Sequence, residues 1–319
     1  MKTDIALLYQ SFQSTDVVQS KLFNCYNKKN IQQAEQKSYE NVYSFIYFIE
    51  HGLTYYQSAQ TAPLSIRPVL LFYGMIQLIK ACLLTVDPLY PETTSVLAHG
   101  VSTRKRKKQG YSFLHDEVKI QKNGLFTHFS DKMFHVKQLE GAKYTMKQLL
   151  SSIPELELNF QYIEKTTPFY KIGTLNSEQY EIPATILDHY KMTQDRFVQY
   201  VEHNTPLKFK AGSEAEKIFI FTGEIRILNS APLYINLSNE SIYFPKNKEM
   251  LWELSDTVIH YLVLYNLSMV CRYETEWWGE LIHTFHSSDL TYITNFLHIT
   301  EEKIPYILYE FIKKQFDCD

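Results

Sequence analysis

The sequence predicts an α+β protein that is mainly α, in which a helical bundle from both chain ends brackets a β-hairpin and a small antiparallel sheet. Apolar residues recur every three or four positions near both ends of the chain, which is the period of one helix face. Between about residues 160 and 245, short β-branched and aromatic runs alternate with turn residues. Asn123-Gly124 is a dipeptide typical of two-residue hairpin turns.

The size and composition of the chain favour one compact body. Its 319 residues are 45% hydrophobic, which is enough for a sizeable core. No repeat and no Gly/Ser-rich linker divides it. We therefore expect residues 1–319 to form a single integrated domain, with a helical core from residues 1–100 and 248–319, a β-hairpin at residues 111–130 and a β-containing middle at residues 160–245.

The first two long helices follow from the spacing of apolar residues. From Ser38 to about Thr61 these residues occupy one helix face, and from Pro68 to Val86 the chain is apolar almost all round. The second segment is therefore expected to be a central core helix. A membrane span is the alternative interpretation, but Lys80 is costly near the middle of a bilayer, and we expect no membrane partner.

The middle of the chain carries the predicted strands. Residues 117–129 alternate on both sides of Asn123-Gly124, so the two arms would pair across a type I′ turn. Four later runs predict the small sheet, namely KIFIF, EIRIL, LYINL and SIYF. A helix from Thr193 to His203 is expected among them.

Cysteine use and the N-terminus indicate the compartment. The four cysteines are widely spread and form no C-x-x-C pair, which fits reduced thiols. The first residues lack the long apolar region and the small-residue cleavage site of a secretory signal. We expect a cytoplasmic protein.

Charge is unevenly distributed along the chain, although the formal net charge is only −3. Residues 101–124 hold seven Lys or Arg against two acidic residues, and residues 250–319 hold four against eleven. The basic run consists of Arg104, Lys105, Arg106, Lys107 and Lys108. Three interpretations remain open: contact with a nucleic-acid backbone, a solvated loop, or docking on the chain's own acidic C-terminal third.

Arginine is rare, with six residues against 26 lysines, and two arginines have strongly apolar neighbours. If the two most apolar helices pack antiparallel, Arg67 and Arg272 come close together and form an anion site beside His99. The candidate anion-binding residues are therefore Arg67, His99, Arg272 and the run from Arg104 to Lys108. The alternative is that each arginine pairs internally, with a glutamate such as Glu274 or with a helix C-terminal carbonyl.

The predicted hairpin and a tryptophan pair supply candidate contacts with a protein partner. The basic side chains of the hairpin could also follow a phosphate backbone while Tyr111 and Phe126 stack on bases. One tryptophan in the core and one at a contact surface is the plainer interpretation of the pair. The candidate residues are Lys119, Lys122, Phe126, His128, Trp277 and Trp278.

The sequence contains little that indicates catalysis. Arg196 and His203 fit the R-x(4–6)-H pattern of HEPN-type ribonucleases and would share one helix face, but an ordinary amphipathic surface helix is the alternative. No G-x-S-x-G, H-E-x-x-H or G-x-x-x-x-G-K-[ST] motif is present. We expect no metal and no cofactor, and the balance is against an enzyme.

Four segments in this order resemble the YaaC-like proteins of bacilli and related bacteria: IRPVLLFYGMIQLIKACLL, AHGVSTRKR, VKIQKNGLFTHF and LYNLSMVCRYETEWWGELI. The resemblance implies a cytoplasmic protein and supplies no catalytic residues to transfer. The family's gene commonly lies near that of IMP dehydrogenase, which implies purine metabolism as context and IMP dehydrogenase as one protein partner. The first helical pair also looks like the hairpins of HEPN-type proteins.

Two functional hypotheses follow from these observations. The first is a non-catalytic cytoplasmic regulatory or adaptor protein that binds a protein partner, with an anionic, nucleotide-like ligand. The alternative is a nucleic-acid-binding or HEPN-like RNA-cleaving helical protein, with the basic run as its contact.

Overall fold

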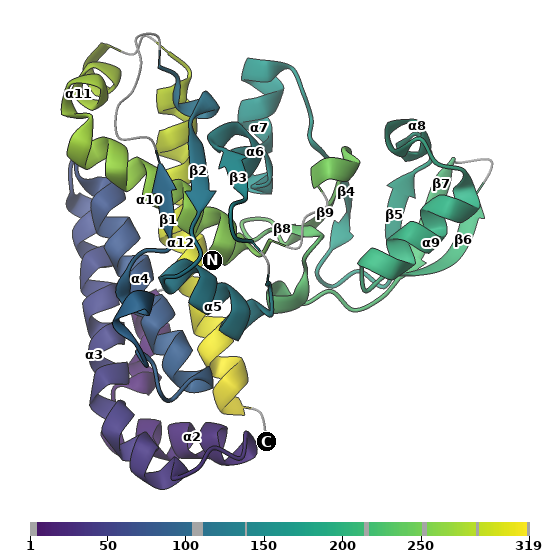
Figure 1. The fold of residues 1–319 in the computed structure, drawn as a ribbon. Helices are drawn as coiled ribbons and strands as arrows, with labels where there is room; N and C mark the ends of the chain where they lie inside the picture. Colours follow the sequence, from purple (N-terminus) through teal and green to yellow (C-terminus); the bar gives the residue numbers. More distant parts are fainter. Residues whose placement is uncertain are drawn as a thin grey trace. The chain divides into compact units, whose positions relative to one another are not determined.

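The computed structural model of the chain describes residues 5–103, 111–137, 139–213, 217–250, 254–284 and 287–317 (Figure 1). The chain divides into two compact units. Unit 1 comprises residues 1–146 and 260–319, and unit 2 comprises residues 147–259. The sequence predicts one integrated body, and the β-containing middle that it predicts at residues 160–245 lies entirely within unit 2.

Unit 1 is mainly helical and uses both ends of the chain, as predicted. α12 lies against α4 and α2, so the last helix of the chain covers helices from its beginning. The helices are α1 (Ile5–Tyr9), α2 (Thr15–Lys28), α3 (Ala34–Thr61), α4 (Arg67–Val86), α5 (Leu125–Phe134), most of α10 (Asp256–Tyr273), α11 (Thr275–Thr284) and α12 (Asp289–Asp317).

The α3–α4 pair is the closest helix packing in unit 1, and two glycines make it possible. A Cβ on Gly52 of α3 would lie 2.8 Å from a methyl carbon of Leu78. A Cβ on Gly74 of α4 would lie 2.9 Å from the Tyr56 ring. The two helix axes therefore approach more closely than larger residues would allow, and the Leu78 and Tyr56 side chains fill the space over the glycines.

The two most apolar helices, α4 and α10, contact each other, as predicted. The Phe72 ring of α4 lies 5.3 Å from the Tyr261 ring and 5.8 Å from the Tyr265 ring of α10. The Trp278 indole, directly after α10, donates to the Ser65 carbonyl oxygen at 3.0 Å. The end of α10 therefore lies beside the start of α4.

The predicted hairpin at residues 111–130 is wrong. β2 (Glu117–Ile120) is the central strand of an antiparallel sheet between β1 (Val101–Thr103) and β3 (Lys143–Thr145), and the expected second arm is helix α5. The apolar residues of this segment were spaced for a helix, because Leu125, Phe126, Phe129 and Met133 form one buried face. Gly124 does have a positive φ, +140°, but it precedes a helix rather than closing a turn.

Unit 2 holds two three-stranded antiparallel sheets, in the orders β4-β9-β8 and β5-β7-β6. The predicted strand EIRIL is wrong, because only a single 3-10 turn forms there, at Ile227–Asn229. The strands are β4 (Phe169–Thr174), β5 (Tyr180–Pro183), β6 (Lys208–Ser213), β7 (Ile218–Thr222), β8 (Tyr234–Asn236) and β9 (Ser241–Pro245), and the helices are α6 (Met146–Ser151), α7 (Glu157–Asn159), α8 (Ile186–Tyr190) and α9 (Gln194–Asn204).

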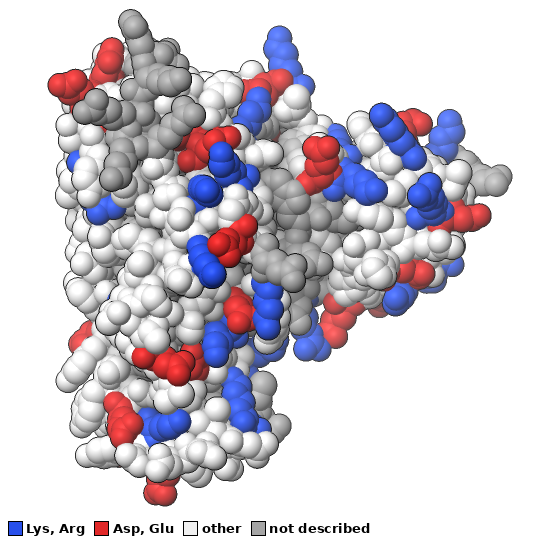
Figure 2. All heavy atoms as spheres, viewed as in Figure 1, with Lys and Arg blue, Asp and Glu red and all other residues white. Residues whose placement is uncertain are grey.

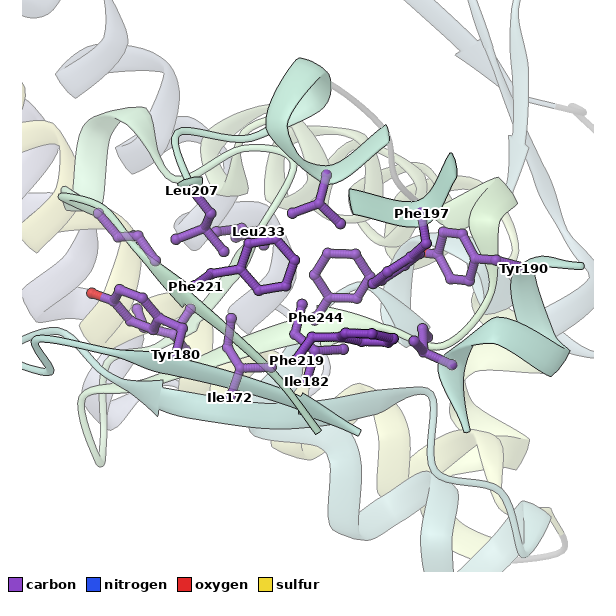
Figure 3. Packing of buried hydrophobic residues seen from close by; sticks show 14 of the residues in the cluster. Ile172, Tyr180, Ile182, Tyr190, Phe197, Leu207, Phe219, Phe221, Leu233 and Phe244 are labelled. Carbon is purple, nitrogen blue, oxygen red and sulfur yellow. The ribbon is translucent and has the colours of Figure 1, made fainter. Parts of the chain in front are cut away.

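The core of unit 2 is aromatic (Figure 3). Phe219 and Phe221 of β7, Phe244 of β9 and Phe197 of α9 are all buried there. The Phe197 ring lies 5.6 Å from Phe219 and 6.0 Å from Phe244. α9, which confirms the helix predicted at residues 193–203, is therefore attached to both sheets through one side chain.

Helix α4 is long and apolar enough to cross a membrane by length and composition alone. However, 67% of its most apolar 18-residue window is buried inside the protein. This degree of burial is typical of a core helix of a globular protein. The contacts with α3, α10 and α12 agree with that interpretation.

Candidate anion-binding site

His99 lies between α4 and β1 and is held by several elements of unit 1. Its carbonyl oxygen accepts hydrogen bonds from the Tyr261 hydroxyl at 2.9 Å and from the Phe126 amide at 3.2 Å. Its ring lies 5.1 Å from the Phe72 ring and 5.7 Å from the Tyr265 ring. The imidazole is therefore fixed, half-buried, among aromatic rings of α4 and α10.

Two cations act on this imidazole. The pKa of His99 is lowered mainly by burial, and the charges of Arg272 on α10 and Lys80 on α4 lower it further. Burial also lowers the pKa of Lys80. Among the residues that the structure describes, no carboxylate forms an ion pair with Lys80 or Arg272. We name Lys80, His99 and Arg272 the cationic cluster.

The Arg272 guanidinium is oriented by its own helix. Its Nε donates to the Ser268 carbonyl oxygen at 3.0 Å, one turn earlier, and its Nη2 lies 3.2 Å from the Met269 sulfur. The group also lies over the Tyr273 ring, with 5.3 Å between its central carbon and the ring centroid. A guanidinium has five N–H donors, and Nη1 makes no hydrogen bond to any described residue, so this arrangement leaves donors for a ligand.

The face of α4 that carries Lys80 adds an unused acceptor. Tyr73, Gln77 and Lys80 follow one another at four and three residues, so they share that face. Tyr73 contacts His99 at 6.2 Å between ring centroids. The Oε1 atom of Gln77 is buried and has no hydrogen-bond partner. A buried acceptor without a donor is costly, and a ligand N–H or O–H group would satisfy it.

The chemistry available at the cationic cluster is binding rather than bond making. Burial raises the pKa of the neighbouring Cys271 thiol to about 12, in spite of the Arg272 charge, so the thiol stays protonated and is a poor nucleophile near neutral pH. Two cations and an imidazole among aromatic rings can hold an anion that carries a flat ring. The cluster is therefore suited to a phosphate-bearing aromatic ligand.

The structure separates Arg67 from the cationic cluster. The Arg67 guanidinium forms an ion pair with Glu301 of α12, and its Nε is buried without a partner. The Arg272 guanidinium instead contacts Ser268, Met269 and Tyr273 near the end of α10, and its charge lowers the pKa of His99. Of the predicted anion ligands, His99 and Arg272 thus lie together, while Arg67 is already neutralised.

Lys80 is the member of the cluster that sequence reasoning missed. The signal was present, since Lys80 is the only charged residue between Pro68 and Val86. It was interpreted only as an argument against a membrane span. A lysine that interrupts an apolar helix needs a partner, and the Lys80 ammonium lies over the Phe48 ring of α3, 5.4 Å from the ring centroid. Its charge also acts on His99.

The basic run from Arg104 to Lys108 lies outside the described residues, but both of its flanks are firmly attached. On one side, the Thr103 hydroxyl oxygen accepts from the Asn266 amide nitrogen at 3.1 Å. On the other side, the Tyr111 hydroxyl donates to Asp116 at 2.9 Å, and Asn266 also donates to Asp116 at 3.0 Å. Buried polar groups of unit 1 therefore hold the residues on either side of the run.

Most of the predicted partner contacts serve the interior of unit 1. Phe126 and Trp278 are buried, and His128 Nε2 lies 2.9 Å from an Asp87 carboxylate oxygen. Trp277 is half-buried, with its ring 4.6 Å from that of Tyr111. Exposed positions remain only for the two predicted lysines, Lys119 and Lys122.

Arg196 and His203 are both exposed on α9 of unit 2. Seven residues separate them, so they do share one face. Within the described residues neither side chain has a hydrogen bond or an ion pair that would orient it for catalysis. The opposite face of α9 carries Phe197 and Val201 into the core.

Charge on the viewed face of each unit is mixed rather than gathered. Lys and Arg side chains alternate with Asp and Glu over the described parts in Figure 2. A nucleic-acid-binding surface normally concentrates positive charge along a groove or stripe. No group of three His, Cys, Asp or Glu residues that could hold a metal ion occurs in the described ranges.

Comparison with known proteins places the chain in a family. No curated protein and no solved structure matches it. The family model described as "YaaC-like Protein" matches residues 10–312, which include the cationic cluster, all of unit 2 and most of unit 1. The chain therefore belongs to the YaaC-like protein family.

Proposed function

We propose that this protein is a non-catalytic cytoplasmic regulatory or adaptor protein that binds an anionic, nucleotide-like ligand at the cationic cluster and responds to it when it binds a protein partner. The observation that carries the proposal is the convergence of Lys80, His99 and Arg272 without a carboxylate partner among the described residues. Lys80 and Arg272 each lie over an aromatic ring but have no carboxylate partner among the described residues, and an anion would compensate their charges. The aromatic rings and the free Gln77 acceptor favour a ligand with a ring and hydrogen-bond donors.

Three probes separate the parts of such a ligand in a binding titration by calorimetry. Sulfate tests the anion alone, guanosine monophosphate tests the anion with a ring, and guanosine tests the ring alone. We expect the monophosphate to bind most tightly, sulfate to bind more weakly and guanosine to bind weakest of the three. If neither sulfate nor the monophosphate binds at millimolar concentration, the proposal is wrong.

Replacing Arg272 by methionine is expected to weaken the binding of both sulfate and guanosine monophosphate. A hydrogen bond to a charged group contributes about 1.5–3 kcal/mol, so the loss should be roughly 10- to 100-fold in Kd. Lys122→Met is the matched control, because Lys122 is an exposed lysine of the same unit outside the cluster. Gln77→Leu should weaken the monophosphate and leave sulfate unchanged.

Sulfate binding is expected to become tighter as the pH falls below about 6.5. The pKa of His99 is lowered in the free protein by burial, Arg272 and Lys80, so the imidazole is neutral at pH 7. A bound anion offsets both cations and raises that pKa, so binding takes up a proton. Affinity then increases by up to about tenfold for each unit by which the ligand raises the pKa.

Sulfate keeps its charge over this range, which makes it the right probe for a titration from pH 7.5 to 5.5. His99→Gln should remove the pH dependence while keeping sulfate binding at pH 7.5. A pH dependence that persists in His99→Gln would assign the proton to another group.

A further inference from the structure

Helix α3 carries an aromatic residue at every fourth position over four turns. The residues are Tyr39, Tyr43, Tyr47, His51 and Tyr55, which we name the aromatic ladder. Its first four residues are exposed, with Tyr39 at 65%, Tyr43 at 52%, Tyr47 at 59% and His51 beyond them, whereas Tyr55 is half-buried. Single exposed aromatic residues are ordinary on a protein surface, but a continuous row of them marks an interaction surface.

Helix geometry explains why one end of the ladder is exposed and the other is not. Each step of four residues advances about 6 Å along the axis and about 40° around it. The row therefore winds around α3 until Tyr55 reaches α4, where its ring stacks on Tyr73 at 6.1 Å. Tyr43 and Tyr47 lie 6.2 Å apart in solvent, before the row turns inward.

The charge beside the exposed rings is acidic. Helix α3 holds three glutamates, Glu35, Glu40 and Glu50, against one lysine, Lys37, no arginine and one histidine, His51 of the ladder. The Glu40 carboxylate accepts only from the Gln36 amide, at 2.8 Å, and within the described chain the Glu50 carboxylate has no partner. Figure 2 shows a largely uncharged area over α3 and α4 on the viewed face.

The geometry points to the exposed part of the aromatic ladder, Tyr39 to Tyr47 with Glu40 and Glu50, as a docking surface for a lysine- or arginine-rich segment of a protein partner. Tyrosine faces attract ammonium and guanidinium groups, and the neighbouring carboxylates add charge complementarity. The same carboxylates repel a nucleic-acid backbone, and they repel the same face of a second copy of this chain. This inference rests on the proposed function only in requiring a protein partner.

The experiment places a photo-crosslinking amino acid at Tyr43 in the full chain, in the cells that naturally produce the protein. The crosslinked segment is then identified by mass spectrometry. We expect a partner segment with at least two Lys or Arg side chains and a net positive charge. The matched control places the same crosslinker at Tyr162 of unit 2, which is 79% exposed and has no such row around it.

Reversing the two charges tests the recognition itself. Glu40→Lys together with Glu50→Lys should reduce the Tyr43 crosslink by at least about tenfold, because attraction to a basic segment becomes repulsion. Both glutamates are exposed, so circular dichroism should show an unchanged fold. Sulfate binding by this variant should also persist, which separates failure of the docking surface from failure of the anion site.

Several results would overturn the inference. A crosslink to RNA, to a second copy of the chain or to an acidic segment would assign the surface to another occupant. A Tyr43 crosslink no stronger than that at Tyr162, or one that survives the double charge reversal, would show that the ladder does not recognise basic segments.

Discussion

Replacing Gly124 by alanine is expected to destabilise unit 1 by about 3 kcal/mol or more. A Cβ at this position would lie 2.3 Å from the Cα of Gly100 and 2.4 Å from its nitrogen, and the φ of +140° disfavours any side chain. The segments around Gly100 and Gly124 cannot move apart easily, because two hydrogen bonds join them. The Leu125 amide donates to the Ala98 carbonyl oxygen at 2.7 Å, and the Gln121 amide donates to the Gly100 carbonyl oxygen at 2.9 Å. Urea unfolding measures the loss.

Two other glycines serve as controls for this substitution. Gly141 has a φ of +80° but no atom within 4 Å of its added Cβ, so Gly141→Ala isolates the backbone strain and should cost about 1 kcal/mol. Gly279 in α11 has neither constraint, and Gly279→Ala should stabilise the helix slightly. If Gly124→Ala costs no more than Gly141→Ala, the close contact with Gly100 does not exist.

Replacing Glu301 by alanine is expected to cost about 2–4 kcal/mol of unfolding free energy. The substitution leaves the Arg67 guanidinium without its carboxylate at a site where Nε is already buried and unpartnered. Tyr56, whose hydroxyl is also buried without a hydrogen bond, lies close enough to Glu301 to feel its charge. Both ends of the Arg67 guanidinium and the Tyr56 hydroxyl would then lack a hydrogen-bond partner in the same part of unit 1.

A double variant that removes the charges of both Arg67 and Glu301 is the control for Glu301→Ala. Arg67→Met with Glu301→Leu should recover most of the lost stability, because no buried charge remains. The double variant should also bind sulfate as tightly as the unchanged protein, since Arg67 lies outside the cationic cluster. Weaker sulfate binding by the folded double variant would show that Arg67 is part of the anion site after all.

Much of the helical core was predictable because its signals are local. The 3.6-residue period predicts the helices at residues 38–61 and 68–86. The need to bury apolar faces predicts that α10 packs against the second of them. The hairpin prediction was wrong because contacts between distant residues decide the structure of this segment. Asn123-Gly124 permits a tight turn, but Gly124 is needed instead for its contact with Gly100, and the following residues bury one helical face.

Only part of the anion-binding site could be predicted from the sequence, again because some of its contacts join distant residues. His99 and Arg272 were identified because rare or isolated polar residues beside apolar segments need partners. Whether Arg67 joins them depends on which way its side chain leaves α4, and only the position of Glu301 on α12 decides this. The aromatic ladder was visible as a four-residue period, but its exposure depends on α4 covering the opposite face of α3.

The division of unit 1 between two distant segments has a consequence during synthesis on the ribosome. Helix α4 is complete at Val86, but α10 and α12, which cover it, end at Tyr273 and Asp317. At about 5–20 residues per second, roughly 10 to 45 s pass before the last of these helices is made. Unit 2, which is continuous in sequence, can fold in that interval, while one side of the most apolar helix of the nascent chain waits uncovered. Exposed apolar surface of this kind is prone to aggregation, so α4 is the segment of the nascent chain that most needs shielding until α10 and α12 have been made.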